Sequence, residues 1–325
     1  MVRFTMQIIR HIDDPALALE GASVTLGNFD GLHLGHQELI KNTVDDARRL
    51  GVCSAVLTFE PHPLRVLAPD RAPKMLLSHK DKMQLLQSLG VDCVVIQQFD
   101  RAFAAIPAED FVRKYLSERL RARKVWVGKD LRFGQGRGGD VAKLCAWGGQ
   151  WGYEVEIVEP VTVAGERVSS SRIRELIGTG EVAAVHPMLA RYYFISGKVV
   201  SGHRRGREIG FPTANIASRA EILPRDGIYA TLFHLGEQVL PSVTSVGLNP
   251  TFGAGARTVE SYIFRFDREI YGESVKLSFV ARLREEMNFA SVASLIEQIH
   301  RDVADAERVL AQQGFLTTAA LDGKS

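Results

Sequence analysis

The sequence predicts an α/β domain with a doubly wound parallel sheet, followed by an antiparallel β-barrel with a C-terminal helix. The chain has 325 residues, more than the roughly 250–300 that one hydrophobic core usually serves, so we expect two domains. Up to about residue 180, short apolar runs alternate with longer helical patterns, as in parallel sheets with crossover helices. From residue 192 onward, short alternating runs are separated by turn residues, as in antiparallel barrels.

In the first domain, helical patterns separate the expected strands. These strands are residues 22–27, 53–59, 91–99, 124–128 and 153–161, and the crossover helices are residues 36–51, 78–90, 107–121 and 139–152. Ser78 is a good N-cap, and Gly51 is a typical residue for the end of a helix. The order βαβαβαβαβ predicts a doubly wound sheet with helices on both faces.

In the second domain, alternating apolar runs indicate an antiparallel sheet that closes or folds over. The expected strands are residues 192–202, 227–236, 238–247, 258–267 and 274–283, followed by one helix over residues 289–313. Another expected helix, residues 171–182, comes just before the change of pattern. We therefore divide the chain into a first domain of residues 1–186 and a second of residues 187–325.

The composition predicts a cytoplasmic globular protein that binds neither nucleic acid nor membrane. Lys and Arg total 40 against 38 for Asp and Glu, so no global field favours an anionic polymer or lipid surface. The basic segment 118–124 lacks an aromatic platform for bases, and we expect it to be solvated. The three cysteines are widely spaced, which indicates reduced thiols. We find neither a signal peptide nor an apolar run of membrane-spanning length.

The stretch "VTLGNFDGLHLGHQELI" places His33 and His36 three residues apart, with Gly35 between them, where the first strand becomes a helix. Ligands of open α/β sheets bind at this crevice, and the start of a helix offers free N–H groups and a positive dipole end. Two imidazoles at this spacing can converge on one anionic group, while glycine lets a nucleotide approach the backbone. The alternative is a pair of surface histidines beside a Gly-rich turn.

The stretch "ERVSSSRIRELI" forms a second candidate anion site, because serines precede Arg172 and Arg174 at the start of a helix. Hydroxyl, guanidinium and backbone N–H groups could all bind phosphate oxygens there. The alternative is a well-capped surface helix with solvated arginines. Together, the two stretches resemble the HxGH nucleotidyltransferase superfamily, which implies attack on the α-phosphate of ATP with loss of pyrophosphate.

Further motifs narrow this resemblance. The chain is similar, in collinear order and through nearly its whole length, to the bifunctional riboflavin kinase/FAD synthetase family of bacteria. The motifs are "GNFDGLHLGH", "LTFEPHP", "GKDLRFG", "VSSSRIR", "GREIGFPTANI", "DGIYA", "GLNPTFG", "VESYIF" and "FVARLREEMNF". The resemblance implies that riboflavin is phosphorylated to FMN with one ATP, and that FMN is adenylylated to FAD with a second.

By resemblance, the first domain is an FMN adenylyltransferase in which His33 and His36 stabilise the ATP phosphates. The residues expected to bind ATP or FMN beside them are Gly27, Asn28, Phe29, Asp30, Gly35, Pro61, His62, Pro63, Asp130, Ser171, Arg172 and Arg174. A stiff Pro-rich connection is the alternative for the "PHP" loop. Such catalysis depends on in-line positioning and on neutralising charge at the α-phosphorus and leaving pyrophosphate.

By the same resemblance, the second domain is a riboflavin kinase. Glu260 is the expected base for the riboflavin 5′-hydroxyl, with an exposed strand glutamate as the alternative. Thr213 and Asn215 are the expected oxygen ligands of Mg²⁺, which would depend largely on ATP oxygens and water because neither residue is charged. The residues expected to hold phosphates or flavin are Gly202, Gly206, Arg207 and Arg284.

Four residues depart from the family pattern: Lys129, Leu131, Ala190, where glycine is usual, and Tyr262, where histidine is common. The first two could alter the affinity of the adenylyl site, and neither of the last two removes a catalytic group. Two other functions stay open at this point: an HxGH transferase for another cofactor precursor, and a catalytically silent flavin-binding regulator. Expected partners are the small-molecule substrates, together with apo-flavoproteins as FAD acceptors.

Overall fold

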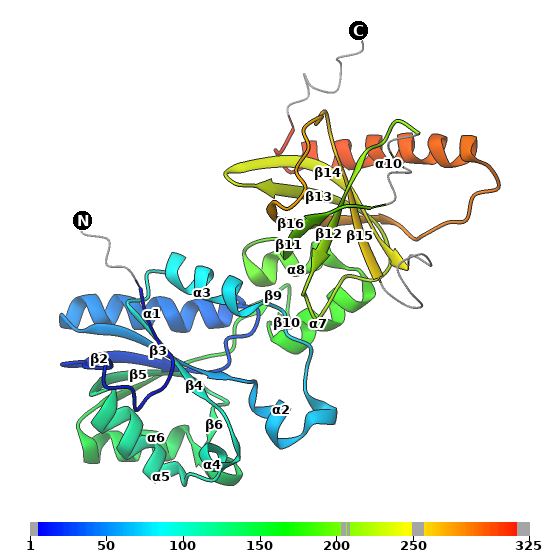
Figure 1. The fold of residues 1–325 in the computed structure, drawn as a ribbon. Helices are drawn as coiled ribbons and strands as arrows, with labels where there is room; N and C mark the ends of the chain where they lie inside the picture. Colours follow the sequence, from blue (N-terminus) through cyan, green and yellow to red (C-terminus); the bar gives the residue numbers. More distant parts are fainter. Residues whose placement is uncertain (1–5, 203–205, 207–208, 249–256, 317–325) are drawn as a thin grey trace. The chain divides into compact units, whose positions relative to one another are not determined.

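The computed structural model describes residues 6–202, 206, 209–248 and 257–316 (Figure 1). Contacts divide the chain into two compact units. The first consists of Met1–Lys74 and His79–Ser169, and the second of Met75–Ser78 and Ser170–Ser325. This confirms the expected fold class, an α/β unit followed by a β-barrel with a C-terminal helix.

The first unit contains a six-stranded sheet in the order β1-β4-β3-β2-β5-β8, and all its neighbouring strands run parallel. The strands are β1 (Gln7–Ile9), β2 (Ala22–Leu26), β3 (Cys53–Glu60), β4 (Cys93–Gln98), β5 (Ala122–Gly128) and β8 (Glu154–Val158). Every residue of β2 is buried, as its apolar run predicts. The strand order reverses at β2, so the crevice for a ligand lies beyond the carboxyl ends of β2 and β5. Strand β1, only three residues long, escaped the sequence analysis.

Helices cover both faces of this sheet: Figure 1 shows α1 and α3 over one face and α5 and α6 over the other. The helices are α1 (Leu34–Leu50), α2 (Pro63–Leu67), α3 (His79–Ser88), α4 (Arg101–Ala104), α5 (Ala108–Phe111) and α6 (Val141–Trp151). Gly51 ends α1 in the left-handed conformation (φ 64°), as expected. The expected helix 107–121 is α5 continued by a π-helical segment, Val112–Arg119. Two short hairpins, β6/β7 (Arg132–Phe133, Gly139–Asp140) and β9/β10 (Thr162–Val163, Glu166–Arg167), were not expected.

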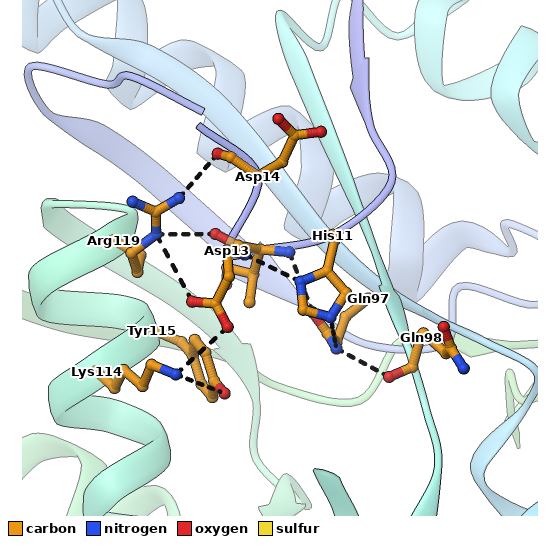
Figure 2. Close-up of polar contacts among 9 residues, drawn as sticks. His11, Asp13, Asp14, Gln97, Gln98, Lys114, Tyr115 and Arg119 are labelled. Carbon is orange, nitrogen blue, oxygen red and sulfur yellow. Dashed lines mark hydrogen bonds and ion pairs between the residues drawn. The ribbon is translucent and has the colours of Figure 1, made fainter. Parts of the chain in front are cut away.

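Polar contacts hold the segment that follows β1 against the π-helical segment and β4 (Figure 2). Arg119 donates from Nε to the carbonyl of Ile12 (2.9 Å) and from Nη2 to that of Asp14 (2.8 Å). Gln97 of β4 accepts a hydrogen bond from the Ile12 N–H (3.1 Å). Arg119, part of the basic segment 118–124, is therefore engaged in contacts within the protein.

The second unit is built around a closed antiparallel barrel in the order β11-β12-β15-β14-β13-β16. The strands are β11 (Tyr193–Val200), β12 (Thr213–Ser218), β13 (Gly227–Leu235), β14 (Gln238–Leu248), β15 (Arg257–Ile263) and β16 (Ser274–Arg284). Strand β12 begins within the "PTANI" motif and was not expected as a strand. Helix α10 (Val292–Gln312) begins at Ser291 with a capping box and packs on the barrel through a buried face that includes Ala306 and Leu310.

Two helices, α7 (Ser170–Thr179) and α8 (Val182–Leu189), belong to this second unit. Helix α7 buries Ile173, Leu176 and Ile177, and the Ile177 carbonyl accepts a hydrogen bond from the Arg225 N–H (3.2 Å). Helix α8 ends at Ala190, whose φ of 53° is left-handed. Ala190, which stands where the family usually has glycine, thus places a Cβ in a backbone conformation that only glycine adopts without strain.

Candidate active sites

The segment Gly27–His33, called the phosphate loop below, connects β2 to α1. Its backbone is left-handed at Phe29 (φ 48°), Gly31 (φ 80°) and Leu32 (φ 42°). The side chains of Phe29 and Leu32 are each only 1% exposed. Such backbone strain persists only where the surrounding packing determines the conformation. Burial of these two side chains therefore holds the loop in one shape in front of α1.

His33 and His36 come together at the start of α1. Their rings stack with centroids 3.6 Å apart, and the Phe29 ring meets His36 edge-on at 5.3 Å. The pKa of His36 lies well below its ordinary value of 6.5, first because the site is desolvated and then because of the charges of His33 and Lys82. His36 is therefore neutral at pH 7, and its Nδ1 finds no hydrogen-bond partner among the described residues. A neutral ring with an unused nitrogen can bind a polar ligand there.

A cavity of about 260 Å³ opens in front of the two histidines. Of the expected residues, it brings together Gly27, Phe29, His33, Gly35, His36 and Asp130. Asn28 and Asp30 of the same loop are not part of its lining. Across the cavity, Lys129 is paired with Glu159 (3.1 Å), and Asp130 is ion-paired with Arg167.

The sequence analysis missed Arg167, which lines this cavity from β10. It stands in a hairpin two residues before the "SSSRIR" stretch. The only signal was therefore a basic residue close to that motif.

The "PHP" loop is linked to the phosphate loop. The side-chain amide of Asn28 lies 3.2 Å from Nε2 of His62, and His62 Nδ1 accepts a hydrogen bond from the Leu64 N–H (3.2 Å). Pro61 and Pro63 flank His62, and Pro63 begins the short helix α2. These two side chains thus place the "PHP" loop in direct contact with the phosphate loop.

Ser171, Arg172 and Arg174 lie in the first half of α7, whose buried face packs with the second unit. Arg172 forms an ion pair with Glu175 one turn later (2.9 Å). Their assignment to the ATP phosphates stays a prediction.

In the barrel, two cavities share the start of β12. The first, about 250 Å³, is lined by Gly202, Gly206, Thr213 and Asn215 and by residues 266–271. The second, about 330 Å³, is lined by Thr213, Glu260, Arg284 and largely apolar side chains: Ile209, Phe211, Tyr262, Met287, Phe289, Leu295 and Ile299. Its lining suits a flat aromatic ligand, and we call it the apolar cavity. The first has the larger polar share of the two and is called the polar cavity.

Strand register brings the expected kinase residues together at this junction. Asn215 on β12 pairs directly with Glu260 on β15, and Thr213 Oγ1 donates to Glu260 Oε2 at 3.5 Å. A Cβ at Gly202 would collide with the Asn215 side chain, and one at Gly206 with the Phe211 carbonyl. The glycines therefore let the loop backbone approach β12 closely. Arg207 lies outside the described residues.

Arg284 is held in place by helix α10. Its Nε and Nη2 donate to the two carboxylate oxygens of Asp302 at 2.7 and 2.6 Å, and Asp302 is 4% exposed. Gln298 also donates to Asp302 (2.9 Å), and the Arg284 guanidinium lies 5.9 Å from the centre of the Phe289 ring. This bidentate pair fixes one wall of the apolar cavity. Tyr262, the departure from histidine, packs edge-on against Phe211.

Comparisons with known proteins agree on both halves. A family model described as FAD synthetase matches residues 16–172, and one described as riboflavin kinase matches residues 189–310. The bifunctional riboflavin kinase/FMN adenylyltransferase of Escherichia coli K12 is 36% identical over 299 residues, 91% of this chain and 96% of that protein. The enzyme of the same name from Bacillus subtilis is 34% identical over 291 residues, 88% of this chain and 91% of that protein.

A solved structure is also similar over nearly the whole chain. A crystal structure from Streptococcus pneumoniae, described as a macrolide-efflux protein, has a TM-score of 0.83 and 30% identity, covering 93% of this chain and 98% of that one. Within the described part of this chain, no helix is both long and apolar enough to cross a membrane.

Proposed function

This chain belongs to the family of bifunctional riboflavin kinases/FMN adenylyltransferases, and from that premise we propose which residues carry its two reactions. The family membership confirms the resemblance seen in the ordered motifs. The enzyme phosphorylates riboflavin with ATP to FMN, and it transfers AMP from ATP to FMN to give FAD and pyrophosphate. Both halves of the chain match family models, one for FAD synthetase and one for riboflavin kinase. These matches argue against a transferase for an unrelated cofactor precursor.

For adenylyl transfer, the proposed site is the cavity in front of the histidine pair. An oxygen of the FMN phosphate attacks the α-phosphorus of ATP, and pyrophosphate leaves. No proton has to be removed from the attacking phosphate, so the histidines bind phosphate oxygens rather than act as bases. Because His36 is neutral, its burial at this site does not carry the desolvation cost of a buried cation. Its ring can donate an N–H to a phosphate oxygen. The phosphate loop, Asp130 and α7 residues Ser171, Arg172 and Arg174 complete the proposed set.

For riboflavin phosphorylation, the single observation that carries the proposal is the junction of the two cavities at Gly206 and Thr213, with Glu260 lining the second cavity beside Thr213. The triphosphate occupies the polar cavity, and the flavin ring occupies the apolar one. Glu260 then accepts the proton of the ribityl 5′-hydroxyl while that oxygen attacks the γ-phosphorus and ADP leaves. The Arg284–Asp302 pair keeps the flavin wall in place.

Mg²⁺ is part of this proposal. Thr213 and Asn215 both line the polar cavity and offer a hydroxyl and an amide oxygen, which are suitable donors for a hard cation. Within the described residues, no cluster of three His, Cys, Asp or Glu could hold a metal. Two neutral oxygens fit an ion such as Mg²⁺ that keeps water and ATP oxygens as its other ligands. When bound, the ion would neutralise part of the negative charge of the ATP phosphates.

We also propose a cytoplasmic location, small-molecule substrates without a nucleic-acid or membrane partner, and apo-flavoproteins as FAD acceptors. Cys53, Cys93 and Cys145 are all free thiols, as expected for a reducing compartment. Lys124 in the basic segment is ion-paired with Asp46 (3.4 Å), which supports a structural role for that segment. We keep the boundary between the two activities at residues 186/187.

The test uses the purified full-length protein with Mg²⁺, ATP and either riboflavin or FMN, followed by chromatography of the flavins. The wild type should make FMN and FAD from riboflavin. His36→Ala should lower FAD formation by about 10²-fold, the usual effect of removing one transition-state donor, and leave FMN formation unchanged. Equal loss of both products would contradict separate sites.

A further inference from the structure

Lys82 is a buried cation beneath the phosphate loop that the sequence analysis did not single out. It lies on α3 and is 8% exposed. Its Nζ donates to the carbonyl of Asn28 (3.3 Å) and to Oγ1 of Thr58 on β3 (3.4 Å), while Thr58 Oγ1 also donates to the Asn28 carbonyl (3.4 Å). One ammonium group thus connects α3 and β3 to the residue next to Phe29, where the backbone becomes left-handed.

Hydrogen bonds to neutral oxygens alone do not explain a lysine at this position. Both of its acceptors are neutral, and within the described chain these are two of the three hydrogen bonds that an ammonium can donate. Burying a cation against neutral oxygens costs more than packing an apolar side chain of the same size. A negatively charged ligand in the neighbouring cavity would favour the cation, and the triphosphate of ATP is such a ligand.

Two carboxylates and the histidine pair face Lys82. Asp30 of the phosphate loop, which is 3% exposed, and Glu60 of β3 favour its charged form, while burial lowers its pKa. Glu60 is in turn 2.8 Å from His79 on α3. On α1, the charge of Lys82 contributes to lowering the pKa of His36. The ammonium is thus near both the loop and the histidine pair.

We propose that Lys82 is a positioning residue for FMN adenylylation, holding the phosphate loop from below at Asn28 and placing a positive charge behind the histidine pair. The inference rests on the proposed adenylyl site. The fixed carbonyl of Asn28 keeps the following left-handed residues aligned, so the loop is preformed when ATP arrives. The buried charge also favours the neutral form of His36 and attracts the phosphates.

The experiment compares three variants of the full-length protein. Lys82→Met keeps the length of the side chain without its charge or donors, and Lys82→Arg keeps the charge. Lys80→Met is the matched control, because Lys80 is exposed on the same helix. All three tryptophans, Trp126, Trp147 and Trp151, lie in the first unit, so their fluorescence in urea reports whether that unit is folded.

For folded Lys82→Met, kcat for FAD formation from supplied FMN should fall by about 10- to 100-fold, the cost of slightly misplaced reactants. Riboflavin phosphorylation should not change. In the wild type, the pH profile of kcat/KM should have a limb that reports His36, identified by its loss in His36→Gln. In Lys82→Met this limb should move to higher pH, because removing a nearby positive charge raises the pKa of an imidazole. Lys82→Arg should restore this limb and part of the rate, and Lys80→Met should match the wild type.

Unchanged FAD kinetics and an unmoved pH limb in folded Lys82→Met would overturn the inference. If that variant does not fold, Lys82→Arg decides: the wild-type limb with retained activity supports the role of the charge, and a displaced limb refutes it. Wild-type protein that makes no FAD would instead refute the proposed adenylyl site itself.

Discussion

Replacing Glu260 with Gln tests the kinase site most directly, because we expect a small effect on stability and a large effect on rate. Glu260 is half-buried on β15 between Asn215 of β12 and Ser245 of β14. The hydrogen bond that it accepts from Thr213 Oγ1, at 3.5 Å, is long, and a Gln oxygen can accept it as well. The substitution keeps the volume of the side chain and removes its negative charge and its ability to take a proton.

The change in the free energy of unfolding should therefore stay within about 0.5 kcal/mol, as for substitutions that break no packing or buried network. If Glu260 is the general base, kcat for FMN formation should fall by about 10²–10⁴-fold. That loss corresponds to roughly 2.7–5.5 kcal/mol in the activation free energy. The effect on rate is thus several times larger than the effect on stability.

The assay follows FMN formation from riboflavin by chromatography and, separately, FAD formation from supplied FMN. Glu260→Gln should lose the first activity and keep the second at the wild-type rate, because the adenylyl site lies in the other unit. Glu237→Gln is the matched control, since Glu237 is exposed in the turn between β13 and β14. Near-normal FMN production by Glu260→Gln would refute its role as the base.

Three more predictions concern stability. Ala190→Gly should stabilise the second unit by about 1 kcal/mol, because the φ of 53° at Ala190 strains a residue with a Cβ; urea unfolding followed by circular dichroism measures this, and a loss of stability would contradict it. Asp302→Ala should cost about 3 kcal/mol by leaving the largely buried Arg284 unpaired, whereas Asp305→Ala on the exposed side of α10 should cost less than about 0.5 kcal/mol; equal effects would argue against the pair. The pKa of His36 is lowered in the folded state, so the unfolded chain binds a proton first as the pH falls below 6.5, and the first unit should lose stability there. Tryptophan fluorescence in urea measures this loss, which should be smaller in His36→Gln. An identical pH dependence in the two proteins would contradict the prediction.

The sequence by itself determined the fold class and most of the elements. Hydrophobic periods near 3.6 and 2 are local properties, so they identified the α/β half, the barrel half and the crossover helices without knowledge of the packing. Glycine and histidine at the end of the first strand marked the ligand crevice, because the edge of a parallel sheet where strands end is set by topology alone. Strand β1 was missed because three residues carry too little periodic signal, and β12 because its residues Thr213–Ser218 are mixed polar and apolar without a clear alternation.

Only the tertiary structure decided which side chains meet. The pairing of Asn215 with Glu260 depends on the register of two strands far apart in the chain, and a shift of one residue would turn Glu260 to the other face of the barrel. Lys82 meets the Asn28 carbonyl across 54 positions of sequence, and α7 packs with the second unit although its motif resembles the first activity. A sequence pattern records the period and chemistry of each segment. Burial, backbone strain and pKa changes arise only when distant segments share one desolvated space, and they were therefore accessible only from the fold.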